Sequence, residues 1–192
     1  KKNKPIILST GASSISEIKS TLNFLSQYKV DVILNHCVLS YPAPTSSANL
    51  GMLLNMSEEF PHIIGYSDHT VPDDEHLVLI CAVSFGASVL EKHFTLDKST
   101  PGNDHYHSYD ENDLTEFNNK LGILRTITGK ELKEVLEVEL PARENARRSL
   151  VYFDNYSKGM TIKEEMIVAK RPGTGISPSK FEDFIGKTLD VD

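Results

Sequence analysis

The chain has 192 residues and a formal net charge of −7, because its 27 Asp and Glu residues outnumber its 20 Lys and Arg residues. A hydrophobic content of 39% with 24% charged residues excludes a disordered acidic tail and can supply a folded core. The acidic balance and the lack of a run of about 18 apolar residues argue against nucleic acid and membrane as partners. Two cysteines cannot form a disulfide framework, which favours a reduced, cytoplasmic protein.

Short apolar runs alternate with segments of helical periodicity over the first 129 residues. Strands are expected at 5–9, 30–38, 63–67 and 88–95, and the first of them is expected to be buried on both faces. Helices are expected after Ser14 or Ser16, at 50–60, at 75–85 and from Asp110 to about residue 129, with Ser14 or Ser16 and Asp110 as caps.

The alternation of strands and helices predicts an α/β fold with a parallel sheet. In such folds the active-site residues lie at the C-terminal ends of the strands. Polar residues follow all four strands, in the segments 9–10 (ST), 36–37 (HC), 67–70 (SDHT) and 91–95 (EKHFT). A doubly wound sheet places its active site at the one point where the strand order reverses. Four consecutive strands with polar ends therefore indicate part of a (β/α) barrel.

The sequence changes in character from about residue 130. Residues 130–146 are rich in charge and are expected to form an exposed helix and a linker. Short strands at 149–153 and 162–168 are separated by turns that contain Gly and Pro, which predicts a small β-rich module of about 45 residues. A module of this size could barely bury a core by itself.

The strongest chemical candidates are His69 and His93, each at or just beyond the end of a predicted strand. Neighbouring parallel strands lie about 4.8 Å apart, so the two imidazoles could bind one divalent cation, with Asp68 and Glu91 orienting them. Two imidazoles leave coordination positions for substrate oxygens and water. The alternative is that one histidine only makes hydrogen bonds in the barrel mouth.

The loop after the fourth strand contains Asp104, His105 and His107. Asp104 could accept hydrogen bonds from a polyol. His105 and His107 resemble metal ligands, but alternate residues in an irregular loop are expected to be solvated. The two histidines are therefore predicted to lie in solvent.

Hydroxyl groups also occur at the strand ends. Ser9, Thr10 and Ser67 could bind phosphate together with loop amides, as such positions often do in barrels, or they could be ordinary turn residues. Tyr41, in the segment YPAP, could stack on a ligand or only stiffen its loop.

Seven segments together resemble the N-acetylneuraminate (sialic acid) synthase family. They are PIILSTG (5–11), HCVLSYPAP (36–44), GYSDHT (65–70), EKHFTLDK (91–98), PGNDHYHS (101–108), ARRSL (146–150) and KRPGTGISP (170–178). The resemblance implies a (β/α)8 TIM barrel followed by a small antifreeze-like (SAF) domain. It also implies a transferase that condenses phosphoenolpyruvate with an N-acylated amino sugar such as N-acetylmannosamine, forming a nonulosonic acid and phosphate.

The resemblance assigns roles residue by residue. His69 and His93 match the family's two metal-binding histidines, for Mn²⁺ or Mg²⁺, and Ser9 and Ser67 match serines that contact the phosphate of phosphoenolpyruvate.

Further matches concern the sugar. Tyr41 and Asp104 match residues that hold the amino sugar. Arg171 matches an arginine that the SAF domain of one subunit places in the barrel of the other, which implies a domain-swapped homodimer.

The resemblance also predicts which part of the family's fold is present. PIILSTG matches the fifth barrel strand, so 1–129 is expected to be the C-terminal half of the barrel, 130–145 a linker and 146–192 a truncated SAF domain. The family's glutamates and phosphate-binding lysines from the first four strands are absent, and the chain starts at Lys1 rather than Met. We therefore expect a fragment that is inactive by itself.

Several alternatives stay open. Leu39 and Asn103 depart from the family motifs, so the enzyme could use a 6-deoxy-diacetamido sugar for legionaminic or pseudaminic acid, or serve spore-coat polysaccharide. A non-catalytic sugar-binding fragment is another reading. A different metal-dependent barrel lyase is a third, although the RPGTG module argues against it.

Overall fold

The computed structural model describes residues 4–102 and 104–190. The chain divides into two compact units, Lys1–Gly129 and Lys130–Asp192, and each is described by itself. The departure from the family motif at Asn103 lies outside the described residues.

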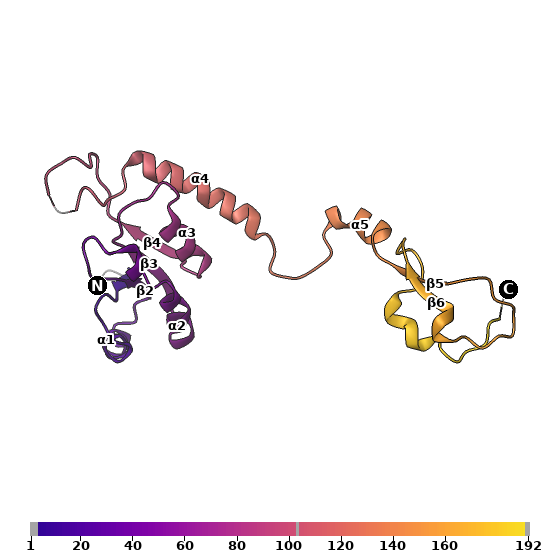
Figure 1. Cartoon of the computed structure of the whole chain (residues 1–192). Helices are drawn as coiled ribbons and strands as arrows, with labels where there is room; N and C mark the ends of the chain where they lie inside the picture. The colour runs from indigo at the N-terminus through magenta and orange to yellow at the C-terminus, as the bar shows by residue number, and fades with distance from the viewer. Residues whose placement is uncertain (1–3, 103, 191–192) are drawn as a thin grey trace. The chain divides into compact units, whose positions relative to one another are not determined.

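The first unit is built on a parallel sheet of four strands, β1 (Ile6–Ser9), β2 (Val32–Cys37), β3 (Ile63–Asp68) and β4 (Val89–Lys92). The strands follow one another in the order β1-β2-β3-β4, and every neighbouring pair is parallel (Figure 1). Each strand is followed by a helix, so the α/β class and the parallel half-barrel sheet predicted from the sequence are confirmed.

The helices of this unit start at local sequence signals. They are α1 (Ile15–Ser26), η1 (Thr45–Ser47), α2 (Gly51–Glu59), α3 (Leu77–Ser84) and α4 (Glu111–Thr128). Ser14 and Asp110 cap α1 and α4 in reciprocal capping boxes, which confirms Asp110 and selects Ser14 over Ser16. Helix α3 begins two residues later than predicted, because the Asp73 carboxylate accepts from the backbone amides of Glu75 and Leu77.

The core lies between one face of the sheet and the helices. Leu34, Ile64 and Tyr66 from the strands pack with apolar residues of the helices, namely Leu53, Met56, Val78, Leu79, Ala82 and Phe117. On the opposite face, Ile7 and Ile63 are 52% and 55% exposed. The expectation that the first strand is buried on both faces is therefore wrong, because helices cover only one face of this sheet.

The second unit is a small antiparallel hairpin with short helices. Its elements are η2 (Glu137–Glu139), α5 (Leu140–Asn145), β5 (Ser149–Tyr152), η3 (Glu164–Met166), β6 (Ile167–Lys170) and η4 (Pro178–Asp183). β5 pairs antiparallel with β6, with Ser149 opposite Lys170. The helix expected within 130–146 is the six-residue α5, which is exposed along its length.

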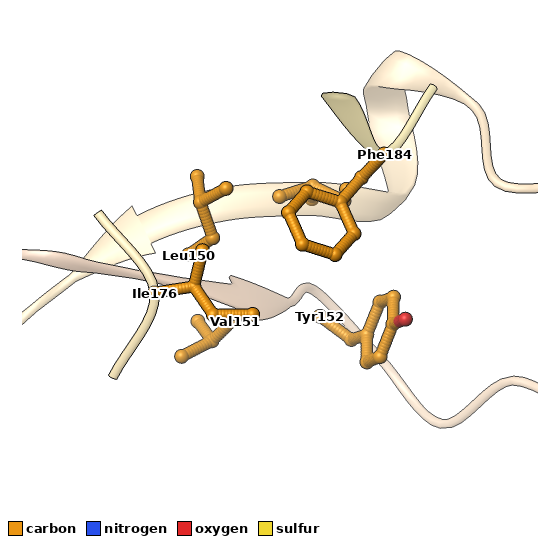
Figure 2. Close-up of a pocket in the computed structure, with 6 residues that line it drawn as sticks. Leu150, Val151, Tyr152, Ile176 and Phe184 are labelled. Atoms are coloured by element: carbon orange, nitrogen blue, oxygen red, sulfur yellow. The ribbon is translucent and has the colours of Figure 1, made fainter. Parts of the chain in front are cut away.

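Hydrogen bonds and apolar contacts hold the hairpin in place. At one end the Ser149 hydroxyl donates to the carbonyl of Pro172 and accepts from the amide of Gly175, at 2.8 Å each, which fixes the RPGTG turn. Apolar side chains from the strands, with Ile176 and Phe184, line a cavity of about 100 Å³ (Figure 2). A cluster around Ile162 and Met166 completes the small core.

No helix in the described ranges 4–102 and 104–190 combines the length and apolar character needed to cross a membrane.

The sheet leaves no room for a side chain at Gly65. A Cβ at this position in β3 would lie 2.6 Å from the carbonyl oxygen of Val89 and would also meet the Asn35 side chain. We expect Gly65→Ala to reduce the free energy of unfolding by about 1–3 kcal/mol, measured by urea denaturation. Gly122 within α4 faces open space, so Gly122→Ala should be neutral or stabilise by up to about 1 kcal/mol. Equal effects of the two changes would contradict this account.

Candidate functional site

The candidate site forms at the C-terminal edge of the sheet, on the face that the helices do not cover. Side chains alternate along a strand, so Ser67 and the following His69 point to the same side. Ser67 of β3 pairs in register with Glu91 of β4, and His93 follows Glu91 with the same alternation. The register therefore brings the predicted histidines together.

His69 is held in one orientation by the backbone. Its Nδ1 lies 2.8 Å from the carbonyl oxygen of Val38, and the residue is 4% exposed. A ring nitrogen facing a carbonyl must donate, so Nδ1 carries a hydrogen and Nε2 is the nitrogen available to a metal. The ring centroids of His69 and His93 are 5.3 Å apart. A neutral imidazole oriented by a backbone carbonyl is the usual form of a metal-binding histidine, so His69 fits the predicted cation.

The loop after β4 folds back onto the strand. The amide of Tyr109 donates to the carbonyl of His93, and the amide of Thr95 donates to the carbonyl of Tyr109, both at 2.8 Å. These bonds carry His107 into the interior, where it is 0% exposed. The prediction of two solvated histidines is wrong for His107, while His105 is half-buried and contacts the Thr95 hydroxyl at 2.8 Å.

Asp104 lies beside two of the histidines. Its Oδ2 is 4.0 Å from His93 Nδ1, and its Oδ1 is 3.8 Å from His107 Nε2. Burial, and next the neighbouring His93, lower the pKa of His107, and the Asp104 carboxylate opposes that shift. His107 is therefore held in the neutral form that can bind a metal.

Tyr41 covers the histidine cluster. Its ring centroid lies 4.1 Å from that of His69 and 5.7 Å from that of His93. Burial raises the pKa of Tyr41, and the acidic groups of Cys37, Asp104 and Glu91 raise it further. The phenol therefore stays protonated and can donate a hydrogen bond to a ligand.

The two serines behave differently. The Ser67 hydroxyl is buried and donates to Glu91 Oε1 at 2.7 Å. Ser9 ends β1 as an exposed residue, in register with Asn35.

Glu91 was expected to orient a histidine, but within the described part of the chain its hydrogen bond is to Ser67 and none joins it to His93. That expectation is corrected, although Glu91 lies on the site face.

Asp68 does not orient a histidine either. It alternates with Ser67 and His69 and so points to the helix-covered face, where it is 3% exposed. There it accepts from the Tyr66 hydroxyl at 3.2 Å and from Lys92 Nζ at 2.8 Å. The predicted role of Asp68 beside His69 is therefore wrong, and Lys92 is its actual partner.

Arg171 belongs to the second unit. It follows β6 as an exposed residue, and its Nε donates to the carbonyl of Ala146 at 2.9 Å. The structure thus brings together Tyr41, His69, His93 and Asp104 of the sequence-based candidates, and adds His107.

The fold and site define an α/β protein with a parallel half-barrel sheet and a histidine cluster at its C-terminal edge. The sequence pattern of the NeuB family matches residues 1–133. The chain belongs to the NeuB family, which confirms the resemblance seen in the sequence.

Several of the relatives are named as acid synthases. The N,N'-diacetyllegionaminic acid synthases of Legionella pneumophila and Campylobacter jejuni are 36% and 37% identical to this chain, over 99% and 97% of it and 54% and 56% of their own length. A crystal structure of N-acetylneuraminic acid (sialic acid) synthetase from Leptospira borgpetersenii, in complex with citrate, matches with a TM-score of 0.64 and 32% identity. That match covers 70% of this chain and 46% of the synthetase. The chain thus spans about half the length of the curated relatives it matches.

The buried pair of Asp68 and Lys92 is expected to stabilise the fold beneath the site. Burial holds the pKa of Lys92 below its usual value, although Asp68 opposes this effect. Lys92→Met leaves the Asp68 carboxylate buried without its cation, so we expect a loss of about 3–5 kcal/mol in the free energy of unfolding.

Denaturant unfolding of a double-mutant cycle checks this expectation. Lys92→Met combined with Asp68→Asn should cost less than the sum of the single changes. Lys120→Met, which removes a more exposed pair with Glu75, is the control and should cost at most about 1 kcal/mol. Strict additivity in the cycle would refute the coupling.

Proposed function

We propose that the chain forms the C-terminal half of the barrel, and the SAF domain, of a metal-dependent nonulosonic acid synthase. The enzyme would condense phosphoenolpyruvate with an N-acylated amino sugar and release phosphate. The observation that carries the proposal is the meeting of Tyr41, His69, His93 and Asp104 at one edge of the sheet. Family membership and the names of the relatives support it.

His69 and His93 are the residues proposed to hold the divalent cation. Imidazole ligands favour Mn²⁺ over Mg²⁺, because Mg²⁺ prefers oxygen ligands. When bound, such an ion would supply Lewis acidity toward the aldehyde oxygen of the open-chain sugar. The carbonyl of Val38 keeps the His69 ring in the binding tautomer.

The remaining side chains are proposed to position the substrates. The protonated Tyr41 phenol would donate to the sugar, and Asp104 would accept from a sugar hydroxyl. Ser9 and Ser67 would contact the phosphate of phosphoenolpyruvate. The Ser67 hydroxyl now donates to Glu91, so a phosphate must replace that carboxylate as its acceptor.

The second unit is proposed to act across a homodimer. In a domain-swapped arrangement, Arg171 of one subunit would meet the N-acyl group of the sugar in the other. The exposure of Arg171 and the anchored turn that follows it support this role.

A second candidate sugar has specific support. Two relatives, at 36% and 37% identity, are named as diacetyllegionaminic acid synthases, whereas the solved sialic acid synthetase is 32% identical. A 6-deoxy-diacetamido sugar is therefore the alternative to N-acetylmannosamine.

Phosphate release from phosphoenolpyruvate in the presence of Mn²⁺ tests the sugar. We expect the full-length protein to release phosphate with one of the two sugars at a rate at least about tenfold above that with the other, because polar groups of the site must pair with the substrate's amides. The 192-residue chain should show no release above background. Release by this chain alone would refute its reading as a non-catalytic fragment, and no release by the full-length protein with either sugar would refute the synthase.

His93→Ala in the full-length protein tests the metal. We expect the variant to lose tight Mn²⁺ binding and turnover together, because one of the two proposed imidazole ligands is gone. Titration calorimetry and the phosphate assay measure the two effects. His62→Ala is the matched control, since His62 precedes β3 at the opposite end of the strand. If His93→Ala retains metal-dependent synthesis, the proposed role of His93 as a metal ligand of the synthase is refuted.

A further inference from the structure

His107 is buried in a way that its protein neighbours do not explain. It is 0% exposed, and neither ring nitrogen has a hydrogen-bond partner among residues 4–102 and 104–190. A buried polar group without a partner costs about 1–3 kcal/mol. His36 is paired with the carbonyl of Ala48 and His105 with the Thr95 hydroxyl. His62 and His76 each leave one buried ring nitrogen without a partner in the described ranges, whereas His107 leaves both.

The surroundings of His107 suit a cation. One donor atom from each of His93, Asp104 and His107 lies within 4.8 Å of the others. The separations from Asp104, 4.0 Å to His93 Nδ1 and 3.8 Å to His107 Nε2, are too long for hydrogen bonds. Donors that bind one ion at about 2.0–2.2 Å lie at most about 4.4 Å apart, and both separations from Asp104 fall below that limit.

His107 is also as near to His93 as the predicted ligand His69 is. The ring centroid of His93 lies 5.4 Å from that of His107 and 5.3 Å from that of His69. The Tyr41 ring lies 6.3 Å from His107, so this imidazole belongs to the same cluster.

We propose that His107 is an imidazole ligand, which binds a divalent transition-metal ion together with His93 and Asp104. The proposal rests on the proposed function in that it shares His93, and it gives the Asp104 carboxylate a metal-binding role beside its proposed contact with the sugar. Two imidazoles and a carboxylate favour Mn²⁺, Fe²⁺, Co²⁺ or Zn²⁺ over Mg²⁺. The ion would then give His107 Nε2, one of the two unpaired ring nitrogens, a partner in the buried site.

Binding of Co²⁺ to the 192-residue chain tests the proposal without any assay of turnover. We expect His107→Ala to lower the affinity for Co²⁺ by about tenfold or more and to change the visible absorption bands, which report the number and type of ligands. His105→Ala is the matched control, because His105 lies in the same loop and pairs with Thr95. It should leave the affinity within about twofold of the starting value.

A second variant covers the case in which His107→Ala fails to fold, as judged by circular dichroism without metal. Asp104→Asn removes the carboxylate at an exposed position and should also lower the affinity for Co²⁺. Unchanged affinity and spectra in the folded His107→Ala variant would overturn the proposal, as would full binding by Asp104→Asn.

Two outcomes separate the ligand role of His107 from the synthase function. If His93→Ala loses Co²⁺ binding and His107→Ala keeps it, the ligand role of His107 is refuted and the synthase function stands. If the starting chain binds no Co²⁺, the three-residue site is refuted, and phosphate release by the full-length protein decides the function separately.

Discussion

The parallel register between β3 and β4 is the constraint on which the core and the site both depend. It sets Ser67 opposite Glu91 and Asp68 opposite Lys92. Because successive side chains point to opposite faces, one pair faces the candidate site and the other faces the helices. A shift of β4 by one residue would turn Lys92 to the site face and Glu91 to the helix-covered face, and would thereby separate Lys92 from Asp68.

The helix-covered face of the sheet is unusually polar near the site. Asp68 receives hydrogen bonds from Tyr66, Thr70 and Lys92, all within the buried layer. A buried charge pair is costly to desolvate, so its attraction must be supplemented by further hydrogen bonds. The network lies directly before His69 and His93 in the chain and thereby fixes the backbone from which both imidazoles project.

Much of the fold could be predicted because its signals are local. The strands and the caps Ser14 and Asp110 follow from apolar runs and from side chains that bond amides three residues away. The pair His69 and His93 was predictable from strand ends in a parallel sheet. The exposure of one face of the first strand was not predictable, because it depends on what covers the sheet.

The sequence by itself determined the α/β class, the parallel sheet, the family and the two strand-end histidines, since these depend on periodicity and on motifs with fixed spacing. Only the tertiary structure decided the partner of Asp68, because that required the pairing register of β3 with β4. It also decided the burial of His107, through backbone hydrogen bonds from Tyr109 to His93 and from Thr95 to Tyr109. Such bonds join separate parts of the chain, and no local pattern encodes them.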